Sequence, residues 1–184
     1  LTGAVNFYES DVRIDHCLFT KNHCEDALNI IRSHFHVNHS TISHTFADGF
    51  DADFCTGTIR DSHFYKTGND CMDFSGSIIT IINCHAEQSG DKGISVGEEA
   101  QITVKSASID GATIGVASKD LSLLTIENID LKNCTQAFAA YQKKAEFGGA
   151  KIKVKNYTVE DVKHLYQIEK GSSLQLGAKL IEGE

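Results

Sequence analysis

The sequence predicts an all-β fold: a right-handed parallel β-helix solenoid of seven to eight coils, each of about 22 residues. Two observations predict it. The same short phrases return at intervals of 22 or 23 residues, and within each phrase apolar and polar residues alternate with a period of two. The 184 residues also include no Pro, which fits a backbone almost wholly in paired strands and tight turns.

The first phrase begins at Asp26, Asp48 and Asp70, where the chain reads DALNI, DGFDA and DCMDF. Further steps of 22 residues reach KGISV, IGVAS and QAFAA. The third position of every phrase is apolar, so we expect one stacked column in the core: Leu28, Phe50, Met72, Ile94, Val116 and Phe138.

A second register runs through the same coils and predicts a strand, a tight bend and another short strand. The first strand is marked by Ile14, Val37, Ile59, Ile81, Val104, Ile126 and Val154. The bend follows at His16, His39, Asp61, Asn83, Ser106, Asn128 and Asn156. The second strand is marked by Phe19, Ile42, Phe64, Ala86, Ile109, Leu131 and Val159.

The period breaks late in the chain. The coil between Gln136 and His164 is longer than the others, which predicts a surface excursion, and residues 164–184 are expected to form the last coil or a cap. We expect residues 1–184 to make a single β-helix domain. Because the chain starts with neither Met nor a signal peptide, we expect a processed or trimmed fragment.

The charge is concentrated in one half of the chain. The net charge is -8, and residues 1–91 hold 13 acidic and 5 basic residues, whereas residues 92–184 hold 12 of each. An acidic surface argues against nucleic-acid binding, which requires a basic footprint. No apolar run is long enough for a membrane span. We therefore expect no nucleic-acid or membrane partner. From the 22-residue repeat we also expect a monomer.

The Cys and His residues give no strong indication of a disulfide or of a metal site. No two of the six Cys occupy neighbouring positions of one column, so we expect all six to be reduced, with Cys17, Cys71 and Cys84 buried. The run HFHVNH contains His34, His36 and His39. The first two should face outward together, as a zinc or copper pair or, as we favour, as surface residues. His63 and His85 should stack in one column.

The candidate site lies on the outward side of the repeated segment that begins at Asp26, Asp48 and Asp70. The repeat places Asp48, Asp51, Asp53, Asp70 and Asp73 in one patch on two adjacent coils. Like charges at this spacing raise one another's pKa, so a shared proton, a bound Ca²⁺ or the ammonium of Lys92 must offset them. The alternative is an aspartate ladder whose carboxylates only satisfy turns.

Residues 45–120 resemble polygalacturonase-type glycoside hydrolases, which belong to the pectin-lyase-like superfamily of right-handed parallel β-helices. Asp48 matches the first catalytic Asp of that family, and Asn69 with Asp70 matches its Asp pair. Lys92 stands where the family has His, and Lys119 matches its Lys. Asn69 replaces the proton donor, and an amide cannot supply a catalytic proton.

The same residues are similar to those of calcium-dependent pectate lyases, in which carboxylates from adjacent coils hold Ca²⁺ and a Lys or Arg abstracts a proton. This resemblance implies oxygen ligands, to which Asn69 could add its amide oxygen, and Lys92 or Lys119 as the base. The predicted catalytic residues are Asp48, Asp70, Lys92 and Lys119. The predicted metal ligands are Asp48, Asp51, Asp70 and Asp73, and the predicted substrate-binding residues are Asp53, Asn69, Lys143 and Lys144.

These observations favour a protein that acts on, or binds, an acidic uronate-containing polysaccharide, with Ca²⁺-assisted β-elimination as the reaction if it is an enzyme. One alternative is a non-catalytic carbohydrate-binding or structural module of a larger surface protein, and another is a pectinase-like hydrolase. The resemblance implies a cell-surface or secreted protein, whereas six unpaired thiols fit a reducing or anaerobic setting.

Overall fold

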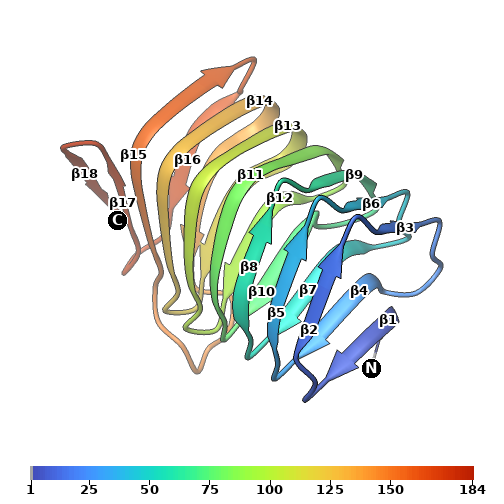
Figure 1. Ribbon diagram of the computed structural model, residues 1–184. Helices are drawn as coiled ribbons and strands as arrows, with labels where there is room; N and C mark the ends of the chain where they lie inside the picture. The colour runs from blue at the N-terminus through green and yellow to red at the C-terminus, as the bar shows by residue number, and fades with distance from the viewer. Residues whose placement is uncertain (1) are drawn as a thin grey trace.

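The computed structural model describes residues 2–184, which form a parallel β-helix with the two chain ends at opposite ends of the stack (Figure 1). These residues contain strands, turns and bends but no helix, so none of them forms a helix with the length and hydrophobicity of a membrane span. The predicted all-β solenoid with a period of about 22 residues is confirmed.

The strands form three parallel stacks along the axis of the solenoid. The first stack comprises β1 (Gly3–Tyr8), β4 (Asp26–Ile31), β7 (Asp48–Asp53), β10 (Met72–Ser75), β12 (Lys92–Gly97), the ends of β13 (Gln101–Lys119) and β14 (Leu123–Tyr141), and β16 (His164–Ile168). The second comprises β2 (Val12–Asp15), β5 (His34–Asn38), β8 (Thr56–Arg60), the starts of β11 (Ile78–Ser89), β13, β14 and β15 (Lys151–Glu160), and β17 (Ser173–Leu176). The third comprises β3 (Leu18–Thr20), β6 (Thr41–Ser43), β9 (His63–Thr67) and the later parts of β11, β13, β14 and β15.

The core is made of the apolar columns that the repeat predicts. Phe50 pairs in register with Met72, and Met72 with Ile94, so each coil places a side chain directly on that of its neighbour. All three side chains are buried. The rings of Phe35 and Phe50 also meet edge to face, with centroids 5.4 Å apart. Burial of these stacked columns provides the main favourable term in folding.

The bends between the second and third stacks follow the prediction in the first coils only. His16, His39, Asp61 and Asn83 adopt left-handed backbone conformations, with φ between 46° and 52°. Asn and Asp tolerate this region better than most residues do, which explains the choice at two of these corners. The tight bends expected at Ser106, Asn128 and Asn156 are wrong, because β13, β14 and β15 run through them without a left-handed residue at these positions.

Two expected core residues are exposed, and both lie in terminal coils. Cys17, expected to be buried, is exposed, because no coil precedes it in the stack. Val159 is 42% exposed, because β17 covers only the first part of β15. These two column positions are therefore exposed for lack of a covering coil, although Ile14, also in the first coil, is buried.

The C-terminal coils depart from the regular repeat. Residues 142–150 form the predicted excursion, a loop between β14 and β15. Within residues 164–184, β16 pairs with β14 and β17 with β15, so both continue the stack. The chain then turns back, and β18 (Lys179–Glu182) pairs antiparallel with β17. This reversal ends the parallel addition of coils.

The structure predicts two classes of thiol. All six Cys are free, as expected; Cys17 and Cys24 are exposed, and the other four are buried. Burial also raises the pKa of Cys71 and of Cys84 to about 11, which lowers the fraction of reactive thiolate. Labelling of the native protein should therefore modify two thiols quickly and four slowly, and denaturation without reductant should expose six. A denatured count of four or fewer would show that a disulfide forms.

Candidate functional site

The predicted aspartates lie together on the outward side of the first stack, which we call the carboxylate face: Asp48, Asp51, Asp53, Asp70 and Asp73. Register pairing places Asp51 beside Asp73 and beside Asn29, and continues from Asp73 to Ser95. The neighbouring inward residues, such as Phe50 and Phe74, are fully buried. The alternation of each strand thus aims the carboxylates away from the core.

Asp48 and Asp70 hold successive coils together. The Oδ1 atom of Asp48 accepts hydrogen bonds from the backbone N–H of Asp70, at 2.8 Å, and from Nδ2 of Asn69, at 2.7 Å. Asp70 repeats the pattern, since its Oδ1 accepts the backbone N–H of Lys92 at 2.9 Å. These contacts are those of an aspartate ladder, and they also occupy the side chain of Asn69, which was predicted to bind substrate.

Asp51 and Asp73 are held by different partners. The Oδ2 atom of Asp51 accepts a hydrogen bond from Nδ2 of Asn29 at 2.9 Å. Asp73 faces Lys119, whose Nζ lies 3.7 Å from its Oδ1 and donates a hydrogen bond of 2.8 Å to Oγ of Ser95. The Lys119 side chain is only 6% exposed, whereas that of Asp73 is 26% exposed. Solvent therefore reaches a carboxylate whose cation is fixed behind it.

Burial and crowding raise the pKa values on the carboxylate face. Burial raises the pKa of Asp51 to about 9, with further contributions from Asp53, Asp73, Asp26 and Asp48. Burial likewise raises the pKa of Asp53 to about 6, reinforced by the Glu98 carboxylate. For Asp48 burial raises the pKa, although the hydrogen bonds from Asp70 and Asn69 oppose the shift. Asp51 is therefore a neutral carboxylic acid at pH 7.

Lys92 is engaged in ion pairs. Its Nζ contacts Asp91 and lies 3.5 Å from Oδ1 of Asp70, and its side chain is 12% exposed. Burial acts to lower the pKa of Lys92, but the carboxylates of Asp70 and Asp91 outweigh it and raise that pKa above its ordinary value. Burial still raises the pKa of Asp70 to about 6, because Lys92 offsets only part of the desolvation. A raised pKa does not suit the role of a base, for which Lys92 was predicted.

The predicted Ca²⁺ ligands do not converge. Among residues 2–184, the one group of three metal-ligating side chains whose atoms lie within 4.8 Å of one another is found elsewhere, at Asp15, His16 and His39. On the carboxylate face the buried Oδ1 of Asn29 lacks a hydrogen-bond partner, but it is the amide nitrogen of Asn29 that faces Asp26 and Asp51. The set Asp48, Asp51, Asp70 and Asp73 is therefore not a preformed Ca²⁺ cage.

Of the two lysines that were predicted to bind substrate from the excursion, only Lys144 forms an ion pair near the carboxylate face. Nζ of Lys144 forms an ion pair of 2.5 Å with Glu98, whose carboxylate also accepts from Ser75, beside Asp53. Lys143 is tied through its backbone N–H to Asp120, and its side chain is exposed. Tyr141, which was not predicted, pairs with Lys119, one 22-residue step before it. Extending the Asp53 column by that step would have found it.

The histidine run divides between two places. His34 and His36 face outward as expected, with their Nε2 atoms 3.2 Å apart and their Nδ1 atoms bonded to Thr56 and Thr58. His39 lies apart from this pair and stacks on His16. His63 and His85 are register partners, as predicted.

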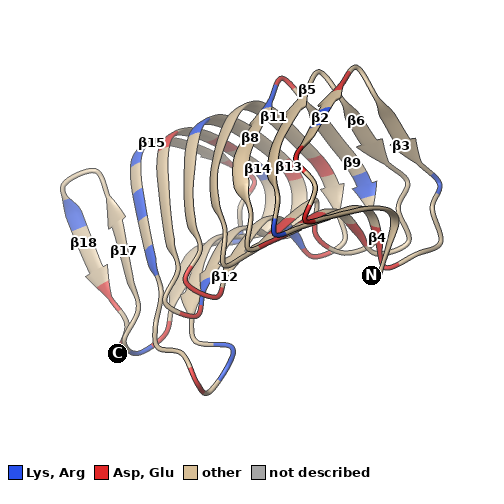
Figure 2. Cartoon of the chain, turned by 60° about the horizontal axis from the view of Figure 1, so that its bottom comes forward, with Lys and Arg blue, Asp and Glu red and all other residues tan. Residues whose placement is uncertain are grey.

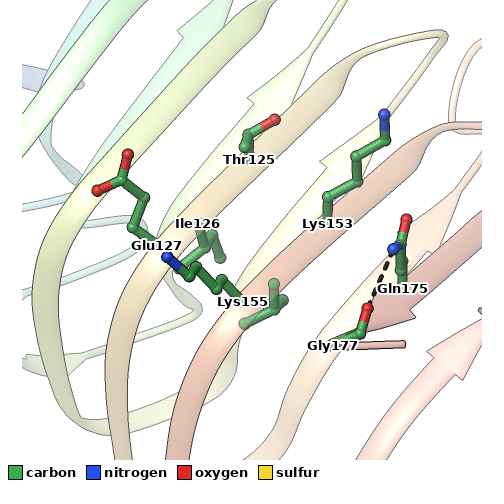
Figure 3. Close-up of a pocket in the computed structure, with 8 residues that line it drawn as sticks. Thr125, Ile126, Glu127, Lys153, Lys155, Gln175 and Gly177 are labelled. Carbon is green, nitrogen blue, oxygen red and sulfur yellow. Dashed lines mark hydrogen bonds between the residues drawn. The ribbon is translucent and has the colours of Figure 1, made fainter. Parts of the chain in front are cut away.

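A hollow of about 390 Å³ lies at the C-terminal end of the second stack, away from the carboxylate face (Figure 3). Thr125 and Glu127 line it from β14, and Lys153 and Lys155 line it from β15. Basic residues recur along β15 (Figure 2). Because no carboxyl group of the carboxylate face lines this hollow, it is not the site that the repeat predicts.

The ladder contacts predict the effect of truncating Asp70. Charge repulsion alone would predict that Asp70→Ala does not destabilise the protein, because one repelling charge is removed. The structure predicts the reverse, because the part-buried N–H of Lys92 loses its acceptor, at a cost of about 1–3 kcal/mol in the free energy of unfolding. Urea denaturation should show this loss, and Asp70→Asn, which keeps an acceptor oxygen, should recover much of it. Equal stability of wild type and Asp70→Ala would contradict the ladder role.

The raised pKa of Asp51 predicts how stability depends on pH. The carboxyl titrates near 3.8 when unfolded and near 9 when folded, so its contribution to stability is complete below pH 3.8 and is lost as the pH rises towards 9. Asp51→Asn, which mimics the neutral acid, should flatten this part of the profile and stabilise the protein by about 1–3 kcal/mol at pH 8.

The exposed residue Asp161 provides the control, because Asp161→Asn removes the same charge away from the carboxylate face. Urea unfolding from pH 4 to pH 9 measures both variants. A lower stability of Asp51→Asn than of wild type at pH 8 would show that Asp51 is ionised and stabilised by its neighbours.

The comparison with known proteins agrees with this architecture. Residues 3–179 match a family model described as the right-handed β-helix region. No curated protein and no solved structure matches the chain. The matched segment covers nearly all of the three-stack solenoid, including every residue of the carboxylate face. The chain therefore belongs to the right-handed β-helix family and has a pectin-lyase-like fold.

Proposed function

We propose that this protein binds a uronate-containing polysaccharide along the carboxylate face and hydrolyses it, with Asp51 as the acid and Asp73 as the base. One observation carries the proposal: two carboxyl groups are in register on adjacent strands, one held by an amide and the other by an ammonium group. The pectin-lyase-like fold supports a carbohydrate-related function.

The two environments suit opposite roles. Burial and surrounding carboxylates favour the protonated form of Asp51, whereas Asp73 has the ammonium group of Lys119 3.7 Å from its Oδ1 atom. Glycoside hydrolysis uses two carboxyl groups in different environments, one as the acid and the other as the base. This assignment moves the acid from Asn69, whose amide cannot donate a catalytic proton, to a carboxyl group on the same face.

The proposed reaction is balanced by these two groups and water. Asp51 gives its proton to the glycosidic oxygen as the bond from that oxygen to the anomeric carbon breaks. A water molecule forms the new bond to the anomeric carbon and gives one proton to Asp73. Release of that proton to solvent and reprotonation of Asp51 restore the starting state.

The preference for uronate rests on the cations around the site. Lys119 lies behind Asp73, and Lys144 reaches the edge of the face near Asp53 through Glu98. The Lys144 side chain is 42% exposed and can meet a carboxylate of the polysaccharide directly, whereas Lys119 is buried and paired with Asp73. A second candidate, Ca²⁺-assisted elimination, is favoured by carboxylate crowding, which a bound cation would relieve. That reaction would need Lys92 or Lys119 to leave its present carboxylate partner.

Glycan digestion tests the proposal. The protein is incubated with polygalacturonate, a mixed uronate glycan and a neutral glucan, each with millimolar Ca²⁺ or with a chelator. We expect new reducing ends from a uronate glycan, with no unsaturated product absorbing in the ultraviolet. Asp51→Asn and Asp73→Asn should each lower the rate at least ~100-fold, as expected for loss of a general acid or base, whereas Asp161→Asn should leave it unchanged.

Three outcomes would overturn the proposal. An unsaturated product that forms only with Ca²⁺ would identify elimination. Glycan binding without cleavage would identify a non-catalytic module. Full activity of Asp51→Asn would remove Asp51 from the acid role. Because Asp51→Asn is expected to fold more stably than wild type, loss of its activity cannot be attributed to unfolding.

A further inference from the structure

A second cluster of polar side chains lies at the corner between the second and third stacks, at the N-terminal end of the solenoid. It consists of Asp15, at the end of β2, His16, which follows it, and His39, which follows β5. The imidazole rings of His16 and His39 stack with centroids 4.8 Å apart. The backbone N–H of His16 donates to the carbonyl of Asn38, and that of His39 donates to the carbonyl of Arg60. Each corner is thus tied to the next coil.

The three side chains converge on one point. Oδ1 of Asp15 lies 3.1 Å from Nδ1 of His16 and 3.3 Å from Nδ1 of His39. Zinc binds nitrogen and oxygen at about 2.0–2.1 Å, so two ligand atoms at the tetrahedral angle lie about 3.3 Å apart. The observed separations therefore match two edges of a tetrahedral metal site. The ligand atoms of all three residues lie within 4.8 Å of one another.

A carboxylate supports this cluster from the third coil. Oδ2 of Asp61 lies 3.6 Å from Nε2 of His39, and Oδ1 of Asp61 accepts a hydrogen bond of 2.6 Å from Asn83. At this distance Asp61 is an ion-pair partner of His39 and not a hydrogen-bond acceptor. With the proton on Nε2 of His39, the lone pair of Nδ1 is free towards Asp15. Metal-ligating histidines are commonly oriented by such a carboxylate on the other ring nitrogen.

From this geometry we infer that Asp15, His16 and His39 form a surface site for a divalent transition metal, with zinc as the best match. The rings are 13° from parallel, so they must tilt to direct both Nδ1 atoms to one ion. The side chains of His16 and His39 are 73% and 49% exposed, and this exposure leaves them free to do so. Three protein ligands leave the fourth position open to water or to another ligand. The site is independent of the carboxylate face.

Calorimetric titration of the full chain with Zn²⁺ at neutral pH tests the inference. We expect a site with a stoichiometry of one that His16→Asn or His39→Asn weakens at least ~10-fold, with a similar loss for the supporting variant Asp61→Asn. Asn suits these corners because Asn83 occupies the equivalent position of the fourth coil with φ of 52°. Binding of Co²⁺ should give the visible absorption bands of a tetrahedral ion.

The double variant His34→Gln, His36→Gln is the matched control, since it removes the other exposed histidine pair on β5. It should leave the corner site unchanged. Zinc binding that survives both corner substitutions, or that is lost in the control, would overturn the inference. Absence of binding at millimolar Zn²⁺ would do the same and would leave Asp15 as an ordinary ion-pair partner of two histidines. Circular dichroism without metal confirms that each variant is folded.

Discussion

Stacking of parallel coils in register is the constraint on which the rest of the structure depends. Adjacent strands lie about 4.8 Å apart, so each side chain faces its equivalent in the next coil at nearly fixed distance. Inside the solenoid this repetition is favourable, because Phe50 packs on Met72 and Met72 on Ile94. Outside, it sets like charges side by side. The same geometry therefore stabilises the core and causes electrostatic repulsion on the carboxylate face.

The chain relieves this electrostatic repulsion in three ways. Asp48 and Asp70 accept backbone N–H groups, so their charge is used to join coils. Asp73 faces the ammonium group of Lys119. Asp51 has only a neutral amide donor beside it and is relieved by taking up a proton. The carboxylate face therefore contains two kinds of carboxyl group. Asp48 and Asp70 are structural, whereas Asp51 and Asp73 form a chemically distinct pair, on which the proposed function is based.

The sequence predicts most of what the repeat controls. The 22-residue step places Phe50 in the core and Asp51 outside, and it pairs Asp51 with Asp73, because period-two alternation and parallel register follow directly from the pattern. It fails at the ends of the solenoid, where Cys17 and Val159 have the right column but lack a covering coil. Burial depends on neighbours that a single repeat does not contain.

Side-chain partners within the site could not be predicted for a related reason. The repeat shows that Asp70 and Lys92 share a column, but it does not show that Asp70 binds the backbone N–H of Lys92 or that Asp91 also pairs with the ammonium. It also grouped His39 with His34 and His36, because they are close in sequence. The corner instead turns His39 towards His16, one coil earlier. Register defines columns, whereas local turns and rotamers decide which atoms meet.

The most direct test of this account is the titration of Asp51 itself. Carbon-detected NMR of the side-chain carboxyl groups, with Asp51→Asn used to assign the resonance, follows its ionisation in the folded protein. Burial of Asp51, together with the carboxylates that coil stacking places around it, predicts a midpoint near pH 9, far above the ordinary value of 3.8. A midpoint near pH 4 would mean that the carboxylate face tolerates the charge of Asp51. That result would contradict both the raised pKa of Asp51 and its role as an acid.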